Sequence, residues 1–457
     1  MRTRTTATEG PEPAAADVVA WPSRGHAWYV VGLLVLAYAL AVVDRIAIGL
    51  LVEPIKADLH ISDTQMGLLQ GLAFAVFYSL FGLPLGVLVD RWKRVDVLAM
   101  GIFVWSAATA ACGLARSYAM LFVGRIGVGA GEGTVTPASS SLIADLFRPN
   151  ERSRAYGVFM VGGAIGTALS YVVGSGAILM ASTLRDWSPG LFGGYADWQL
   201  AFIVMGAPGI LLALLVNFTL REPMRRDVVD AGQAFSLTPI LRQLRSNWAA
   251  YLAIMGGTVL NVMVVNAQIA WLPTMFIRAH GWTAAQVGAT LGMLGFPAGT
   301  FSALSAGVVL SWLSARGRTD GPILVVMLQA LVWAVFGTIK SLTPDTTIAL
   351  GAHVVTSLFA IWAVTAALAG LNQITPNQFR GQITAIYTLF TGLVGVTIGP
   401  LMVGLLSDHV FPGPKGLQPS LATMYAVGGI GGVLLLLAAR KSYSDAVIRA
   451  RSWTTNG

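Results

Sequence analysis

The chain has 457 residues, of which 55% are hydrophobic and only 11% are charged, and its mean hydropathy is +0.70. Soluble domains carry about 25% charged residues, so most of this chain belongs in a lipid environment. The net charge of +8 comes from basic residues grouped in short loops between apolar segments, which argues against nucleic acid as a partner. The single cysteine, Cys112, excludes an internal disulfide framework.

Segment 1–25 contains Ala, Thr, Pro and Arg without an apolar run, so we expect a disordered tail and not a secretory signal. A helix of about twenty apolar residues spans a bilayer, whereas a barrel strand has only about 9–11. The sequence therefore predicts an all-α membrane protein. Its twelve transmembrane helices are expected at 28–52, 65–89, 96–114, 119–146, 154–180, 199–219, 249–277, 284–313, 322–341, 346–372, 381–407 and 420–439.

The segments that connect these helices differ in charge. Those on the side of both termini contain 21 Lys and Arg residues, whereas those on the other side contain 6. Positive residues concentrate in cytoplasmic loops. We therefore expect both termini in the cytoplasm and a multi-pass protein of the inner (plasma) membrane.

The second half of the chain repeats the first. Ile61–Gly71 resembles Trp282–Gly292, and four residues recur without a gap at an offset of 221 positions. Such repetition predicts two six-helix halves, as in many secondary transporters. The recurring residues are Gln65, Gly67, Gly71 and Gly86, which return as Gln286, Gly288, Gly292 and Gly307.

The two halves are expected at 26–220 and 248–440. A polar, Arg-rich cytoplasmic linker at 221–247 joins them, and a cytoplasmic tail at 441–457 follows. Within the linker, Pro239–Arg245 has the pattern of a short amphipathic helix that lies on the membrane.

Four charged residues lie inside apolar runs of the first half: Asp44, Arg45, Arg125 and Glu132. An ionised side chain at the bilayer centre costs about 2.5–3.5 kcal/mol on insertion scales, so such residues usually mark an ion or substrate pathway. Their depths along the helices favour pairing across helices, so we expect the four to form one cluster. If rocking of the halves breaks the pair Asp44–Arg45 or Arg125–Glu132, the freed carboxylate takes up a proton. A purely structural ion network is the alternative.

A charged loop joins the second and third predicted helices on the cytoplasmic side. Asp90 ends a helix there and can pair with Arg91 or Arg94, or with the N-terminus of a facing helix near Gly381. Such a contact would exist in only one of two conformations, which predicts a gate. An ordinary positively charged loop is the alternative. The predicted cytoplasmic gate consists of Gly86, Asp90, Arg91 and Arg94.

Polar and thioether side chains within the apolar runs are candidates for the lining of a substrate cavity. Each of them alone is more often an interhelical hydrogen bond or part of the core. The candidates are Tyr38, Gln70, Thr136, Met263, Asn266, Gln268 and Tyr387.

Enzyme chemistry is not indicated. The sequence contains neither an HExxH motif nor a serine nucleophile elbow, although an intramembrane enzyme needs paired catalytic groups or metal ligands. We therefore expect no catalytic residue, no metal site and no cofactor, with the proton as the coupling ion.

Several motifs resemble the Spinster family of the major facilitator superfamily. They are the Asp44–Arg45 pair, the Asp90–Lys93 loop, the run Gly131–Phe147 and the helix end Gly404–Asp408. The resemblance covers residues 41–408 and departs from the family pattern at Gly133 and Val95, outside the charged cluster. It implies transport of sphingolipids or lysophospholipids. It also implies proton-linked or gating roles for Asp44, Arg45, Arg125 and Glu132.

We therefore predict a secondary active transporter that moves a single-chain amphipathic lipid by proton-coupled alternating access. One chain contains both halves of such a machine, so a monomer is expected. A proton-coupled carrier of a small organic anion or drug is one alternative. A passive lipid facilitator, indifferent to a pH gradient, is another.

Overall fold

The computed structural model describes residues 21–226 and 237–451, and within these two ranges the chain is helical, without a strand. Eleven helical segments of the described residues are long and apolar enough to cross a membrane. The predicted all-α membrane architecture is thus confirmed. The predictions for residues 1–20, 227–236 and 452–457 fall outside the described residues.

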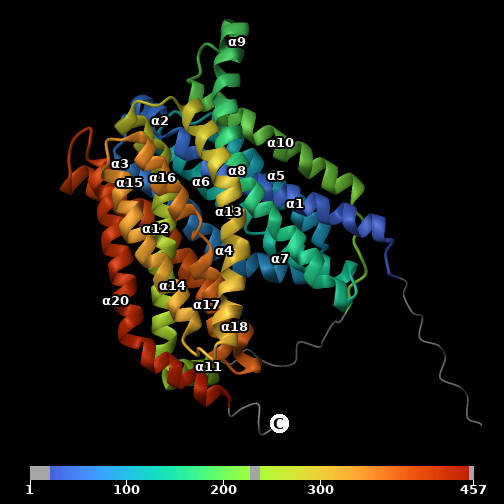
Figure 1. The fold of residues 1–457 in the computed structure, drawn as a ribbon. Coiled ribbons are helices and arrows are strands. Elements are labelled where there is room, and N and C mark those ends of the chain that lie inside the picture. Colours follow the sequence, from blue (N-terminus) through green and yellow to red (C-terminus); the bar gives the residue numbers. More distant parts are fainter. Residues whose placement is uncertain (1–20, 227–236, 452–457) are drawn as a thin grey trace, which may run out of the picture.

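The first half of the chain, which we call the N half, contains the blue to green helices of Figure 1. Its elements are α1 (Arg24–Ala47), η1 (Ile48–Leu50), α2 (Val52–Leu59), α3 (Asp63–Gln70), α4 (Leu72–Arg91), α5 (Arg94–Cys112), α6 (Tyr118–Glu132), α7 (Val135–Leu146), α8 (Pro149–Trp187), α9 (Pro189–Phe192) and α10 (Asp197–Thr219).

The second half, the C half, interrupts several of its spans with short π-helical turns, which bend a helix by displacing its hydrogen bonds. The linker helix α11 (Leu237–Ser246) precedes it. The elements of the C half are α12 (Trp248–His280), α13 (Ala284–Ala315), α14 (Gly321–Val332), η2 (Trp333–Gly337), α15 (Thr338–Leu342), α16 (Thr346–Ser357), α17 (Trp362–Ile374), η3 (Asn377–Phe379), α18 (Arg380–Phe390), η4 (Thr391–Val396), α19 (Thr397–Leu405), η5 (Leu406–Val410) and α20 (Leu417–Arg451).

One predicted span is divided in two. The sequence predicts a single helix at 119–146, whereas α6 ends at Glu132 and α7 begins at Val135. The hydroxyl of Thr134 donates a 2.9 Å hydrogen bond to the carbonyl oxygen of Gly131, and glycine disfavours a continuous helix. The carboxylate of Glu132 therefore stands at the C-terminal end of a helix.

The linker helix is present as α11, with one buried and one exposed face. Ile240 is buried against the C half, and Gln243 donates a 3.4 Å hydrogen bond to the carbonyl oxygen of Ile374. Leu241 and Arg242 are exposed. At the other end of the C half, α20 continues through Arg451, past the predicted boundary at residue 440.

The repeated residues bring the two halves together. A Cβ atom on Gly67 of α3 would lie 2.6 Å from the carbonyl oxygen of Pro400 on α19. At the position equivalent by the sequence repeat, a Cβ on Gly288 of α13 would lie 2.5 Å from the carbonyl oxygen of Tyr171 on α8. Only glycine permits such backbone approach. The repeat thus supplies two equivalent contacts between the halves.

These contacts lie toward one end of the bundle. We call the end where α1 begins and α20 ends the terminal face, and the opposite end the distal face. Figure 1 shows α1, α5, α7 and α10 inclined away from α12, α14 and α20 toward the terminal face. There, a Cβ on Gly86 or Gly381 would meet nothing within 4 Å. The halves are therefore closed at the distal face and separated at the terminal face.

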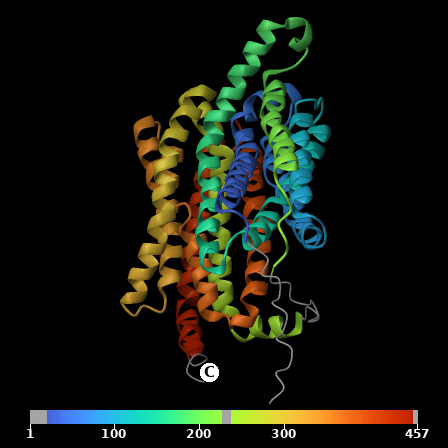
Figure 2. The same cartoon turned by 90° about the vertical axis from the view of Figure 1, so that its right-hand side faces the viewer.

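The distal face also carries a projection. Helix α8 has 39 residues, about 58 Å at 1.5 Å per residue, and its end rises above the neighbouring helices with α9 (Figure 2). An exposed ion pair of 2.8 Å between Arg185 and Asp197 ties the two limbs of this hairpin together.

We expect Gly67→Ala to lower the unfolding temperature, because its Cβ would overlap the backbone of α19. Overpacking of this kind costs about 1–3 kcal/mol. The matched control is Gly307→Ala, at a repeated glycine where a Cβ meets nothing within 4 Å; this change should leave the unfolding temperature unchanged or raise it. Thermal unfolding in detergent measures both variants, and equal shifts would contradict the glycine contact.

Asp320, between α13 and α14, joins the C half at the terminal face. It accepts hydrogen bonds from Arg318 at 2.9 Å and Arg440 at 2.6 Å. The hydrogen bond from Arg318, supported by Arg440, holds the pKa of Asp320 below its ordinary value. A carboxyl with a depressed folded-state pKa stabilises the fold above its unfolded pKa, and this stability is lost as the pH falls through the folded pKa.

Asp320→Asn should therefore lower the unfolding temperature at neutral pH. Below about pH 4, its unfolding temperature should fall less with pH than that of the wild type. Asp445→Asn, at an exposed carboxylate on α20, serves as the control and should follow the wild-type profile. The measurement is the unfolding temperature as a function of pH. An unchanged acid profile for Asp320→Asn would rule out this linkage.

Candidate functional site

The charged cluster centres on an ion pair between α1 and α6. The Nη2 atom of Arg45 lies 2.6 Å from Oε2 of Glu132, whose side chain is only 1% exposed, whereas that of Arg45 is 31% exposed. The guanidinium carbon of Arg45 lies 4.5 Å from the ring centroid of Phe74 and 5.2 Å from that of Tyr78. The rings and the carboxylate together hold the arginine side chain in place.

Asp44 and Arg125 complete the cluster. Asp44 accepts a 3.2 Å hydrogen bond from the hydroxyl of Thr109 on α5. Arg125 donates a 3.4 Å hydrogen bond to the backbone carbonyl of Asp44, not to its carboxylate. Both side chains are buried. The structure thus brings all four predicted charges together within the N half.

The two particular pairs predicted within this cluster were wrong, although the expected pairing across helices is present. The sequence predicts Asp44 with Arg45 and Arg125 with Glu132, but the observed ion pair is Arg45 with Glu132. Adjacent residues point to different sides of a helix, so Asp44 and Arg45 face different neighbours. Residues seven apart are separated by about 10.5 Å along a helix, which is too far for Arg125 to reach Glu132 directly.

Several polar atoms of the cluster have no partner among the described residues. They are Oε1 of Glu132, Nε of Arg45, and Nε and Nη2 of Arg125. Buried polar atoms are rarely left unpaired outside functional sites. The cluster therefore holds unused hydrogen-bonding capacity next to an ion pair that is partly accessible.

A cavity of about 840 Å³ lies between the two halves, within the size range of small-molecule sites. Arg45 is its single charged lining residue in the described part of the chain. Most of the wall is apolar, from both halves: Val42, Ile46, Phe74, Met160, Val161, Ile269, Phe296, Leu304, Ile361 and Val396 among others.

Three of the predicted cavity residues line this space: Tyr38, Gln70 and Asn266. Four others do not, and these predictions are corrected. Gln268 is two residues from Asn266 on α12 and therefore points to the opposite side, toward Tyr425. Tyr387 is buried in the core of the C half, Met263 packs with its backbone against Gly399, and Thr136 lies on α7 outside the lining.

The predicted gate is not assembled in this conformation. Asp90 and Arg91 are exposed, and no hydrogen bond or ion pair of Asp90 occurs within the described ranges. Arg94 is buried and belongs to a different network. It pairs with Asp145, donates 2.7 Å hydrogen bonds to Glu222 and to the carbonyl of Pro223, and so holds the start of the linker against the N half.

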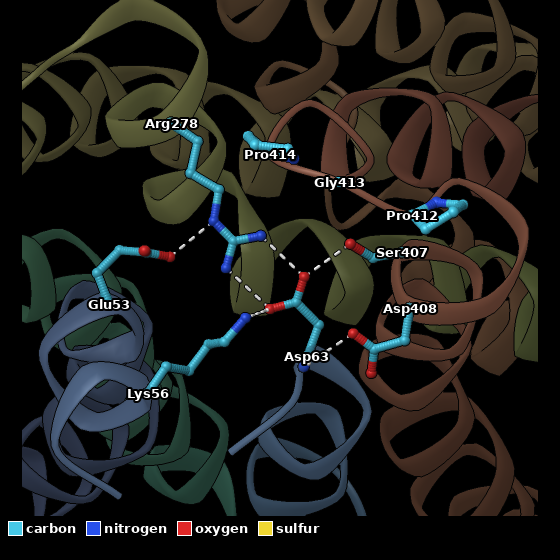
Figure 3. A pocket seen from close by; sticks show the side chains of 9 residues that line it. All are labelled: Glu53, Lys56, Asp63, Arg278, Ser407, Asp408, Pro412, Gly413 and Pro414. Carbon is cyan, nitrogen blue, oxygen red and sulfur yellow. Dashed lines mark hydrogen bonds and ion pairs between the residues drawn. The ribbon is translucent and has the colours of Figure 1, made fainter. Parts of the chain in front are cut away.

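Sequence reasoning missed a network at the distal face, which we call the distal latch: Glu53, Lys56, Asp63, Arg278, Ser407 and Asp408 (Figure 3). Arg278 of the C half binds both carboxylate oxygens of Asp63 at 2.8 Å, and its Nε lies 2.7 Å from Glu53. Lys56 also pairs with Asp63.

The latch continues into η5. The hydroxyl of Ser407 donates a 2.6 Å hydrogen bond to Asp63, and Asp408 accepts one of 2.7 Å from the backbone N–H of Thr64. Lys56 and Arg278 are two of the six basic residues on the otherwise weakly charged side. Their scarcity there, and the position of Asp63 within the repeated segment, was the signal that could have revealed the latch.

The sequence profile of the Major Facilitator Superfamily matches residues 34–400. The chain therefore belongs to this superfamily of membrane transporters, and it is not an enzyme.

Several relatives within the superfamily are spinster proteins. Human protein spinster homolog 1 is 26% identical, over 94% of this chain and 83% of its own length. A bacterial homologue of the human lysosomal transporter Spinster, solved in an inward-facing and occupied conformation, has a TM-score of 0.77 and 25% identity over 93% of this chain and 97% of its own. The resemblance to the Spinster family is confirmed.

Another relative carries a different description. An MFS-type efflux pump of Mycolicibacterium smegmatis is 26% identical, over 93% of this chain and 96% of its own length. Relatives at this level thus include spinster proteins and a protein described as an efflux pump.

Removal of the latch arginine should open the distal face. Arg278 and Asp63 are 15% and 4% exposed, and loss of one partner from a buried ion pair costs about 3–5 kcal/mol. We expect Arg278→Met to shift the protein from the closed to the open distal conformation. The distance between spin labels at Ala57 of α2 and Thr347 of α16, both exposed, measures the two populations.

Arg185→Met is the matched control, because Arg185 and Asp197 form an ion pair on the same face but are 40% and 35% exposed. Exposed pairs contribute about 0–1 kcal/mol, so this variant should keep the wild-type distance distribution. A closed distal face in Arg278→Met would show that the latch does not hold the two halves.

Proposed function

We propose that the protein is a secondary active transporter that moves a single-chain amphipathic lipid by proton-coupled alternating access. The observation that carries this proposal is the position of Arg45, which reaches from the buried Glu132 into the cavity between the halves. A ligand in the cavity meets one cation, and this cation is the partner of a buried carboxylate.

This arrangement links an anionic headgroup to a proton. Arginine binds phosphate and carboxylate groups through two parallel hydrogen bonds, so a lipid phosphate at Arg45 competes with Glu132. A buried carboxylate without its cation is costly as an ion and is stable only after it binds a proton. Headgroup binding thus favours proton uptake at Glu132, and the return of Arg45 favours its release.

The apolar wall supports an acyl chain as the rest of the substrate. Met160 and Val161 on α8, and Phe296 and Leu304 on α13, line the cavity and are also exposed. Helices α8 and α13 touch closely nearer the distal face, at Gly288. These four side chains present an apolar surface beside Arg45 on which an acyl chain can lie.

The closed distal face and separated terminal face suit one end state of alternating access. The charge distribution predicts that the terminal face is cytoplasmic. The cavity would then be loaded or emptied from the cytoplasmic side, in line with the inward-facing description of the bacterial Spinster homologue.

A carrier of a small organic anion or drug is the second candidate. The similarity to an efflux pump favours it, and so does the single cation of the cavity. Such a carrier would use Arg45 in the same way but would not require a long apolar chain.

The test is flux of labelled lysophospholipid in proteoliposomes, with and without an imposed pH gradient. We expect the gradient to raise flux, and Glu132→Gln or Asp44→Asn to abolish this gradient-driven component because neither variant can bind the proton at that side chain. Glu151→Gln is the control, since Glu151 forms an exposed ion pair with Arg24; it should behave as wild type.

Other outcomes separate the alternatives. Flux that ignores the gradient would indicate a passive facilitator. Absent lipid flux, with gradient-driven flux of a small organic anion, would indicate the second candidate. Full gradient-driven lipid flux in both carboxylate variants would refute the proposed coupling.

A further inference from the structure

The polar wall of the cavity limits which headgroup a lipid substrate can carry. Beside Arg45, the described lining contains neutral polar side chains and no carboxylate. Which of these side chains donate hydrogen bonds and which accept them decides what the headgroup must offer in return. The neutral polar lining residues are Tyr38, Gln70, Thr167, Asn266, Thr300 and Thr365.

Four of these side chains direct their hydrogens into their own helices. The hydroxyls of Thr167, Thr300 and Thr365 each donate to the carbonyl oxygen four residues earlier, at 2.9, 2.8 and 3.1 Å. Nδ2 of Asn266 donates in the same way, at 2.9 Å. A hydroxyl in this state offers a ligand its lone pairs and not its hydrogen. These residues, on α8, α12, α13 and α17, therefore form a wall of acceptors, which we call the acceptor wall.

The donors of the cavity come from α1 and α3. Gln70 at the end of α3 is 8% exposed, and its Nε2 has no hydrogen-bond partner among the described residues. The same holds for Nε of Arg45. Buried donors are rarely left without a partner outside functional sites. The cavity is thus polarised, with a cation and an unused amide donor on one side and acceptors on the others.

The formal charge of this lining is not balanced for a cationic ligand. Arg45 is the charged residue of the described wall, and its partner Glu132 is only 1% exposed. An anionic group that pairs with Arg45 satisfies the cation. Nothing in the described wall then supplies a second negative charge for an amine, and an ionised group that leaves water without a counter-charge is costly.

Aromatic rings do not compensate a quaternary amine here. Such groups are bound by cages of aromatic faces, and the aromatic residues of the described lining are Tyr38, Phe74 and Phe296. Phe74 already has Arg45 at 4.5 Å from its ring centroid, and Tyr38 is stacked on Phe159 at 5.1 Å. A trimethylammonium group also has no N–H to give to the acceptor wall. Choline therefore finds neither of its usual partners.

Hydroxyl groups fit the same wall without adding charge. A phosphodiester accepts hydrogen bonds from Arg45 and Gln70, while the hydroxyls of a polyol donate to the acceptor wall. A primary amine can donate to this wall as well, but it brings a charge that the lining does not balance. A polyol headgroup thus satisfies more of the cavity than an amine headgroup does.

We propose that the cavity selects single-chain lipids whose headgroup is the phosphodiester of a polyol, such as glycerol, and discriminates against amine headgroups, most strongly against choline. Gln70 and the acceptor wall determine this specificity, and Arg45 holds the phosphate. The inference rests on the proposed lipid transport and specifies the headgroup, which that proposal leaves open.

The experiment compares lysophosphatidylglycerol, lysophosphatidylethanolamine and lysophosphatidylcholine with the same acyl chain. Each displaces labelled lysophosphatidylglycerol from the full chain in detergent, without a pH gradient. We expect the glycerol headgroup to bind about tenfold more tightly than choline, which is the factor that one or two net hydrogen bonds supply, with ethanolamine between them. Equal or tighter binding of the choline lipid would overturn the proposal.

Thr300→Val and Thr365→Val test the acceptor wall, because each removes a hydroxyl at nearly constant size. Both should weaken binding of the glycerol lipid severalfold and leave binding of the choline lipid unchanged. Thr388→Val is the matched control: its hydroxyl makes the same bond within α18, at 2.9 Å, outside the lining. This variant should bind all three lipids as the wild type does. An equal loss for both headgroups in the cavity variants would show that the hydroxyls only support their helices.

Asn266→Asp tests the charge argument. It places a carboxylate on the acceptor wall with almost no change in shape, so it should raise the affinity for the ethanolamine lipid relative to the glycerol lipid. An unchanged ratio of the two affinities would contradict the argument.

Failure of this inference is distinguishable from failure of the proposed function. Gradient-driven flux of lysophosphatidylcholine, together with binding as tight as that of the glycerol lipid, would refute the headgroup selectivity alone. If none of the three lipids binds and a small organic anion is carried instead, the lipid function and the headgroup inference are both refuted.

Discussion

A charge inside a membrane-spanning bundle needs a partner within the protein, because hydrocarbon supplies none. Arg45 and Glu132 meet this need for each other across α1 and α6, at 2.6 Å. The pair is unequal, since the carboxylate is sealed from the cavity and the arginine is not. An anionic group that enters the cavity can therefore take the place of Glu132 as the partner of Arg45. A ligand in the cavity cannot reach Glu132 directly, because Arg45 lies between them.

The contacts between the halves place this pair under conformational control. The closest approaches occur where glycines let backbones touch, at Gly67 and Gly288, and the distal latch adds a bidentate contact between Arg278 and Asp63. Backbone contacts at glycines do not fix the angle between two helices, whereas a bidentate ion pair holds one geometry. The glycine contacts therefore allow the halves to rock, and the ion pair of the latch stabilises the state in which the distal face is closed.

Much of this fold follows from the sequence. The length of the apolar runs predicts the helices, and the internal repeat predicts the two halves. The cost of burying a charge in the membrane singles out the four charged residues of the cluster. The pairing of these charges does not follow, because it depends on which helix faces lie together, and Asp44 and Arg45 face different neighbours. The latch was missed for the same reason: Asp63 and Arg278 are 215 residues apart and meet only in the folded chain. Lys340 is one of the six basic residues counted in the sequence on the weakly charged side, but the structure buries it on α15, because hydropathy does not encode depth in a bundle.

Helix α12 shows how these separate features act on one another. Asn266 reaches the cavity, Gln268 binds Lys340 and Arg278 closes the latch, all from a single helix with Pro273 between the last two. A straight helix would transmit every displacement of the latch to the cavity. Pro273 removes a backbone hydrogen bond between these positions, so the segments on its two sides are able to adjust separately to the latch and to the cavity. Residues that hold α12 on either side of Pro273 therefore influence which state the cavity presents, although none of them has to touch the substrate.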